Sequence, residues 1–176
     1  MPTGFVPFGG GWTNLGGTIL TGAAATTGVV EFTPMDLLHV SYMVTGYGGA
    51  DIASLRFNAD SGANYWDRHT SIAAAGTVMT NVQNASTTLI RLAAANATVQ
   101  RSGLVQIMNV SGTGKVAMIC NQTGSGAAAT IPVVESVGGG EWVNTTQQIR
   151  SIEMRTAGGQ NLNAGSGFVI FGCNLS

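Results

Sequence analysis

The stretch GLVQIMNVSGTGKVAMICNQ, residues 103–122, decides the fold class. Apolar residues recur in it at every second position, as in Val105 and Ile107 and again in Val116, Met118 and Cys120. Successive side chains of a β-strand point to opposite faces, so this period is typical of strands. The intervening SGTG is a turn of the hairpin type. The stretch therefore predicts two paired antiparallel strands.

The same period extends through most of the chain. In LHVSYMVTG (residues 38–46) it places four residues on one face: Leu38, Val40, Tyr42 and Val44. Further strand candidates are TTGVVEFT, IASLRFN, NYWDRH, TTLIRLA, IPVVESV, EWVNTT, QQIRSIEMRT and GFVIFGC. Clusters of Gly, Asn and Thr separate them, and no long window shows helical spacing. We therefore predict an all-β chain: a single antiparallel β-sandwich, jelly-roll-like, of about nine or ten short strands.

Charged residues are scarce. Only 9% of the 176 residues are Asp, Glu, Lys or Arg, against roughly 25% in an average soluble domain, while 26 are Gly. Charge normally keeps a soluble monomer dispersed. We interpret the composition as that of a chain that hides much of its surface against other subunits. A small extracellular β-domain of low charge is the alternative.

Several classes of partner are not expected. The net charge is −1, with a single lysine, so no basic face is available for nucleic acid. No apolar run approaches the ~20 residues that cross a bilayer. The start of the chain has neither a basic nor a continuous apolar region, so we expect no signal peptide. Cys120 and Cys173 lie in apolar runs and are expected to be free and buried, although a disulfide between them stays open.

The first residues, MPTGFVPFGGGW, differ from the rest in composition. They combine two prolines and three consecutive glycines, which discourage a regular element, with four large apolar side chains: Phe5, Val6, Phe8 and Trp12. We assign residues 1–17 to an extended arm and residues 18–176 to the sandwich, with these four side chains as the contact to a neighbouring molecule. The alternative is a first edge strand folded back on the chain's own sandwich.

The stretch LRFNADSGANYW, residues 55–66, is either a ligand site or a turn. Calcium would use four oxygen-bearing residues: Asn58, Asp60, Asn64 and Asp67. A sugar would stack on Tyr65 and Trp66. The spacing is not that of an EF-hand. Asn, Asp, Ser and Gly together favour Asx-type and left-handed turns. We prefer a turn between two strands.

Residues for catalysis are hard to find. Asp67 and His69 share one side of a strand, but such a pair needs a Ser or Cys nucleophile, and no Gly-x-Ser-x-Gly elbow occurs. His39, inside an apolar strand, is expected to be a core or interface residue. SGTGK departs from the phosphate-loop spacing. We predict no enzyme, no cofactor and no metal, with Tyr65, Trp66 and His69 as possible surface or oligomer contacts.

Two stretches, LRFNADSGANYW and IRSIEMRTAGGQNLNAGSGFVIFGCNL, carry a resemblance to a known family. The chain resembles small β-sandwich virion structural proteins of tailed bacteriophages, of the capsid decoration, head-fibre or tail component type. The matching positions are Arg56, Phe57, Asn58, Asp60, Gly62, Asn64, Tyr65, Gly165, Ser166, Phe168, Ile170 and Gly172. The resemblance spans roughly residues 52–173. The charged DRH after Trp66 departs from the pattern.

The resemblance implies a capsid decoration, or cement, protein that stabilises the head by bridging major capsid subunits. Its partners would be copies of itself, with a trimer preferred, and the major capsid protein, without nucleic acid or membrane. It would be made in the host cytoplasm and lie on the outer capsid surface of the virion. The alternative is a tail-tip or fibre component that binds a host-surface glycan or receptor.

Overall fold

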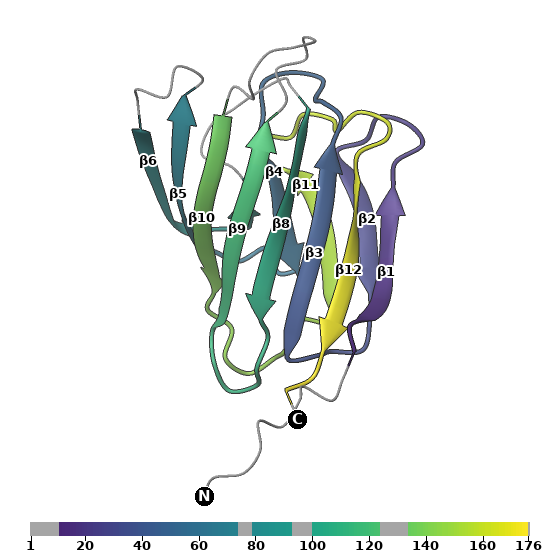
Figure 1. The fold of residues 1–176 in the computed structure, drawn as a ribbon, viewed down its shortest axis with the longest axis vertical. Helices are drawn as coiled ribbons and strands as arrows, with labels where there is room; N and C mark the ends of the chain where they lie inside the picture. The colour runs from purple at the N-terminus through teal and green to yellow at the C-terminus, as the bar shows by residue number, and fades with distance from the viewer. Residues whose placement is uncertain (1–10, 74–78, 93–99, 124–133, 176) are drawn as a thin grey trace, which may run out of the picture.

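Two antiparallel β-sheets stacked on each other form the molecule (Figure 1). The computed structural model describes residues 11–73, 79–92, 100–123 and 134–175. The strands are β1 (Thr13–Ile19), β2 (Thr26–Glu31), β3 (Leu37–Val44), β4 (Ala53–Phe57), β5 (Tyr65–Ala73), β6 (Met79–Thr87), β7 (Ile90–Arg91), β8 (Arg101–Met108), β9 (Lys115–Thr123), β10 (Val134–Trp142), β11 (Ser151–Thr156) and β12 (Gly167–Cys173).

The two sheets differ in size. The larger has eight strands in the order β1-β12-β3-β8-β9-β10-β5-β6, and the smaller has four in the order β2-β11-β4-β7. In Figure 1 the eight-stranded sheet lies in front of the four-stranded one. The predicted all-β antiparallel sandwich is confirmed, and the 12 strands found in the described ranges exceed the predicted number. The described ranges contain no helix that is long and apolar enough to span a membrane.

The prediction of separate strands in IPVVESV and EWVNTT is wrong, because β10 runs through the triglycine 138–140 between them without interruption. Gly138 and Gly140 are required by their neighbours rather than by a turn. A Cβ on Gly138 would collide with the His69 ring, and a Cβ on Gly140 would lie 3.1 Å from the Ile90 side chain. The glycines thus leave room for the side chains of His69 on β5 and Ile90 on β7 close to the strand.

The predicted boundary of the arm at residue 17 is also wrong. Residues 13–19 form β1, which pairs with β12 along the edge of the large sheet. A Cβ on Gly17 would lie within 3.0 Å of Val169 Cα, so glycine here permits a close backbone approach. Phe5, Val6 and Phe8 lie outside the described residues. Their role as a contact arm stays a prediction.

The core lies between the sheets and follows the predicted alternation on β3. Leu38, Val40, Tyr42 and Val44 are all buried there. The hairpin between β8 and β9 is confirmed as well, with Gly112 at a φ of 80° in its turn. The prediction grouped Val116, Met118 and Cys120 on one face of β9, and that face points away from the core. The side that faces the core carries three other residues: Lys115, Ala117 and Ile119.

Candidate functional site

The stretch LRFNADSGANYW is a turn that ties three parts of the chain together. Asn58 and Ala59 both have left-handed backbone, with φ of 51° and 54°. Asn58 Oδ1 accepts hydrogen bonds from the backbone N–H groups of Arg150 and Ser151, at 2.9 and 3.1 Å. Its Nδ2 donates to the Gln148 carbonyl at 2.9 Å. Asn58 therefore fastens the turn to the segment that enters β11.

Asp60 holds the other side of the turn. Its Oδ1 accepts from the Gly62 N–H at 2.8 Å, and its Oδ2 accepts from Trp142 Nε1 at 2.7 Å and from Asn64 Nδ2 at 3.0 Å. Burial raises the pKa of Asp60, but the three hydrogen bonds together with the Arg56 charge outweigh that effect and lower its pKa overall. Both carboxylate oxygens are thus engaged by N–H donors.

Tyr65 was a candidate surface contact, and this prediction is wrong. The side chain is fully buried and stacks on Trp142, with ring centroids 6.3 Å apart. Its hydroxyl accepts from the Phe57 N–H at 3.0 Å, and the Asp60 carbonyl lies 3.1 Å away as an acceptor. Tyr65 therefore closes the turn from the inside.

Asp67 and His69 share a side of β5, as their spacing predicts, and His69 Nε2 lies 3.6 Å from Asp67 Oδ1. Both side chains are fully buried, so the prediction of His69 as a surface or oligomer contact is wrong. Asp67 also accepts from Asn84 Nδ2 at 2.5 Å and from the Arg91 N–H at 3.2 Å. Burial lowers the pKa of His69, although the Asp67 charge raises it in part. In this position the pair packs the core between β5 and β7.

The surface that stands out is the side of the eight-stranded sheet turned away from the small sheet, which we call the outer face. On the five strands from β12 to β10 its described side chains alternate with the buried ones. They are Val169, Phe171, Cys173, Leu37, His39, Ser41, Met43, Ser102, Leu104, Gln106, Met108, Val116, Met118, Cys120, Val137 and Glu141.

The outer face is apolar and nearly free of charge. Met108, Val116 and Met118 are 54%, 52% and 49% exposed and lie side by side on β8 and β9. Among the side chains that define the face, Glu141 alone is charged, and it lies at the end of β10. Contiguous apolar surface of this kind marks interaction sites in soluble proteins.

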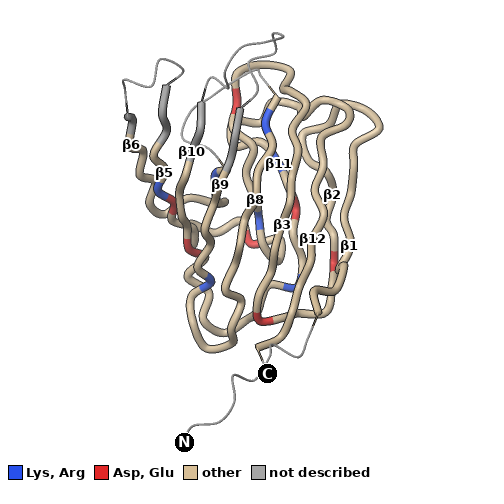
Figure 2. Tube along the Cα trace, in the orientation of Figure 1, with Lys and Arg blue, Asp and Glu red and all other residues tan. Residues whose placement is uncertain are grey.

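The small sheet provides a contrast within the same molecule. Its solvent side carries Glu31, Arg56, Glu153 and Arg155, placed there by the pairing of β11 with β2 and β4. Arg155 and Glu153 approach to 3.8 Å. Four of the chain's few charged residues thus gather on the face of the small sheet, while the larger outer face carries two among its described side chains, Glu141 and Arg68, both near its β5 edge. Figure 2 marks the few charged residues along the described part of the trace.

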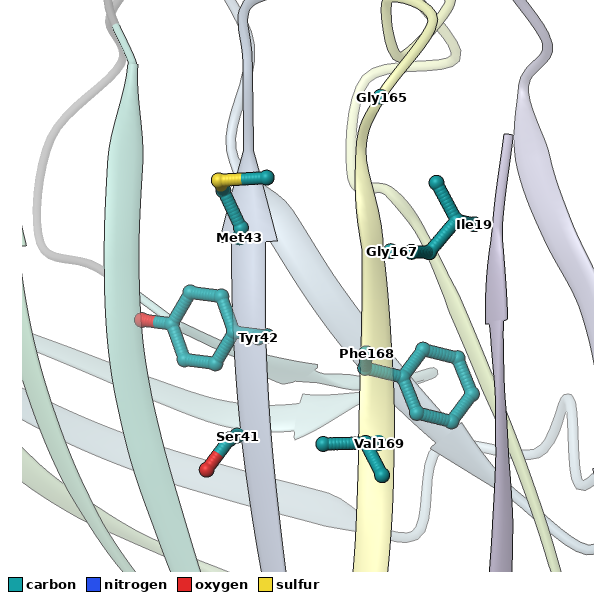
Figure 3. Close-up of a pocket in the computed structure, with 8 residues that line it drawn as sticks. All are labelled: Ile19, Ser41, Tyr42, Met43, Gly165, Gly167, Phe168 and Val169. Carbon is teal, nitrogen blue, oxygen red and sulfur yellow. The ribbon is translucent and has the colours of Figure 1, made fainter. Parts of the chain in front are cut away.

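Two hollows lie on the outer face, at opposite ends of β3. One, of about 270 Å³, is centred on Gly167, which has Met43 and Ile19 on either side (Figure 3). The other, of about 260 Å³, is lined by Leu37, Met108, Val116, Met118 and Trp12, among others. Both are lined mainly by apolar side chains, so they suit apolar partners.

Trp12, a predicted contact residue, lies at the rim of the second hollow and is 51% exposed. Its ring meets the His39 imidazole edge to face, with centroids 5.7 Å apart. His39 in turn meets Phe171 at 6.4 Å. The partly exposed His39 ring thus belongs to the outer face rather than to the core.

Trp66 is 44% exposed, which leaves it as the one accessible member of the predicted aromatic pair. It lines a third hollow, of about 220 Å³, together with Arg68, Gln83 and Glu141. This hollow lies near the β5 edge of the same sheet face and is more polar than the other two in its lining residues.

Sequence reasoning missed Met108, Val116 and Met118 as surface residues, because an apolar period of two was taken to point at the core. A signal for them exists in the same stretch: β8 and β9 are apolar on both faces. Strands of that kind are typical of sheets that are covered on both sides. Lys115 does not reveal which face of β9 is exposed, because a lysine is expected at the surface and this one is buried. Its ammonium donates to the carbonyls of Thr113 and Asn144.

Comparison with known proteins finds no family. No protein-family model matches the chain, and no curated protein matches it. Among solved structures, a mutant of alginate lyase Aly36B in complex with alginate tetrasaccharide aligns with a TM-score of 0.33 and 8% identity, over 91% of this chain and 80% of that one. Scytalido-glutamic peptidase aligns with a TM-score of 0.26 and 11% identity, over 87% and 64%. The botulinum neurotoxin serotype D ligand binding domain gives 0.21 and 9%, over 96% and 42%. Likenesses this weak carry no functional argument.

Proposed function

We propose that this chain is a structural protein of a tailed-phage virion, a capsid decoration protein that stabilises the head by bridging major capsid subunits. The observation that carries the proposal is the distribution of charge between the two sheets. The small sheet has a charged, solvated face, whereas the outer face of the large sheet exposes Met108, Val116 and Met118. A chain that folds in this way needs a protein partner over its larger sheet.

The resemblance to virion proteins supports the virion as the place where that partner is found. It rests on the turn residues from Arg56 to Tyr65 and on the closing residues from Gly165 to Gly172. In the fold, the first group joins β4 to β5 and the second leads into and forms most of β12. Both groups therefore lead into strands of the large sheet, β5 and β12.

The proposed mechanism is passive burial. Each Å² of apolar surface removed from water contributes about 25 cal/mol. The net gain per contact is smaller, because association costs translational and side-chain freedom. Repetition over a capsid lattice makes the sum large, and it would oppose the outward pressure of packaged DNA.

A copy count in purified virions tests the proposal. Quantitative mass spectrometry is expected to find this chain in numbers comparable with the major capsid protein. Heads stripped of the chain should rebind it, and deletion of residues 1–10 should weaken rebinding while the sandwich stays folded, as checked by circular dichroism. Absence of the chain from the particle would refute the proposal, and unchanged rebinding after the deletion would refute the arm.

A second candidate is a tail-tip or fibre component that binds a host-surface glycan. It is favoured by the exposed Trp66 beside Arg68 and Glu141, because sugar rings stack on aromatic faces and bind polar groups at their edges. Binding to a glycan array that is lost in Trp66→Ala and kept in Trp12→Ala would favour this function. A decoration protein should bind no glycan, and a few copies per virion would likewise indicate the tail.

A further inference from the structure

We propose that the outer face packs against the same face of a second copy of this chain, about a two-fold axis that crosses β3. This inference rests on the proposed function: a second copy covers the outer face within the assembly, and the contact to the major capsid protein is assigned to the N-terminal arm whose deletion is tested above. It differs from the trimer that the sequence led us to expect.

The size of the face matches what a stable pair requires. The five strands of the outer face, from β12 to β10 in sheet order, at about 4.8 Å spacing span about 24 Å, and seven residues along a strand span about 23 Å. The product is about 550 Å² per copy, or about 1,100 Å² for the two copies together, which exceeds the ~1,000 Å² in total that a specific interface should bury. One copy of the chain therefore offers enough surface for the other.

The charge of the face suits contact with itself. A face that meets its own copy places like charges opposite each other unless it carries almost none. The side chains from β12 to β9 include no Asp, Glu, Lys or Arg among the described residues that define the face. His39, Ser41 and Gln106 supply polar groups that can hydrogen-bond across the contact without a net charge.

The positions of the projecting Trp12 and of the Gly167 hollow on the outer face suit a two-fold axis. Trp12 stands at the Leu37 end of β3, and the hollow at Gly167 lies at the Met43 end. Leu37 and Met43 are six residues apart, or about 20 Å along the strand. A two-fold axis in the plane of the face, perpendicular to β3, exchanges these ends. It would set Trp12 of each copy over the Gly167 hollow of the other, which is the reciprocal contact that such symmetry demands.

A three-fold ring would not use the face in this way. In a ring each subunit presents two different surfaces to its two neighbours, so one face cannot meet itself. The outer face would then pack on some other surface of the neighbour, and Trp12 would not reach the Gly167 hollow of a second copy. The native mass distinguishes the two arrangements.

The test is the native mass of the purified full chain, measured by light scattering and sedimentation over a range of concentrations. Val116→Glu introduces a charge into the apolar contact beside Met108 and Met118 and is expected to weaken association at least about 100-fold. Val29→Glu is the matched control. Val29 is 50% exposed on the solvent side of the small sheet, and Val116 is 52% exposed on the outer face of the large sheet. The control should associate within about twofold of the wild type.

Trp12→Ala gives a second reading that does not introduce a charge. Since Trp12 would fill the hollow of the other copy, its loss should weaken association by about tenfold or more. Far-UV circular dichroism and the urea midpoint of each variant check that it folds. A wild-type mass of two chains, reduced in Val116→Glu and Trp12→Ala but not in Val29→Glu, would support the pair.

Three results would overturn the inference: a monomeric wild type at its highest soluble concentration, a mass of three chains, or equal effects at Val116 and Val29. The proposed function is tested separately by the virion. A monomer that binds heads would leave the virion role standing without the pair. A two-fold pair that is absent from every particle would support the pair and refute the virion role.

Discussion

Asp60 shows how single polar residues determine this fold. Its carboxylate joins the exposed turn at Gly62 to the buried indole of Trp142, and Asn58 joins the same turn to the start of β11. The residue types alone predict a turn, because Asn, Asp and Gly favour its backbone. They do not predict that Asp60 reaches Trp142, since 82 residues separate the two in the chain.

Replacing Asp60 tests this role at the residue scale. Asp60→Ala leaves the part-buried Trp142 N–H without its acceptor, so we expect the free energy of unfolding to fall by about 2–3 kcal/mol. Ser61→Ala, at the neighbouring exposed position, should change it by less than about 0.5 kcal/mol. Urea unfolding followed by tryptophan fluorescence measures both. Equal losses would mean that Asp60 is only a surface turn residue.

His69 makes stability depend on pH. Burial lowers its pKa below the usual 6.5, so the unfolded chain binds the proton more readily than the folded chain. Its contribution is therefore fully present above pH 6.5 and is lost as the pH falls below that value through the lowered pKa of the folded state.

We expect the free energy of unfolding of the wild type to decline as the pH falls from about 6.5. His69→Gln should show a flatter profile in that range, whatever its absolute stability, because the titrating group is gone. Urea unfolding at a series of pH values measures the slope. Identical slopes in both proteins would show that His69 does not titrate differently on folding.

At the scale of elements, the apolar period of the sequence predicts most strands and misses the two at the edges of the large sheet. The apolar period gives β3, β8, β9 and β12 directly. It gives neither β1, which is rich in glycine, nor β6, which is polar through MTNVQNAST. Both are outermost strands of the large sheet, each bonded to one neighbour strand, so their side chains need not be apolar on either face.

The triglycine of β10 contains one glycine whose neighbours leave no room for a side chain and one whose neighbours leave more room. A Cβ on Gly138 would clash with the Arg68 carbonyl and the His69 ring, whereas the nearest atom to a Cβ on Gly139 is the Ala117 carbonyl oxygen at 3.2 Å. Gly138→Ala should therefore lower the free energy of unfolding by about 2–3 kcal/mol. Gly139→Ala should lower it by less than about 1 kcal/mol. Thermal and urea unfolding compare the two, and similar losses would contradict the packing argument.

At the scale of the whole molecule, the distribution of charge is the feature that the account depends on. Composition predicts that some surface is hidden, because 9% charged residues are too few to solvate a monomer of 176 residues evenly. It does not say which surface. The hidden surface is identified by the orientation of β9, in which Lys115 points inward while Val116 and Met118 point outward. An apolar strand with two similar faces does not reveal this orientation from its sequence.

The most direct test of the central claim is methionine oxidation in the assembled particle. Peroxide converts accessible methionine to the sulfoxide, and Met43, Met108 and Met118 lie exposed on the outer face of the single chain. Mass spectrometry of intact virions should show these three residues oxidised several-fold more slowly than in the folded chain released and diluted from the same particles. Equal rates in the two samples, or the absence of the chain's peptides from the virions, would contradict the account.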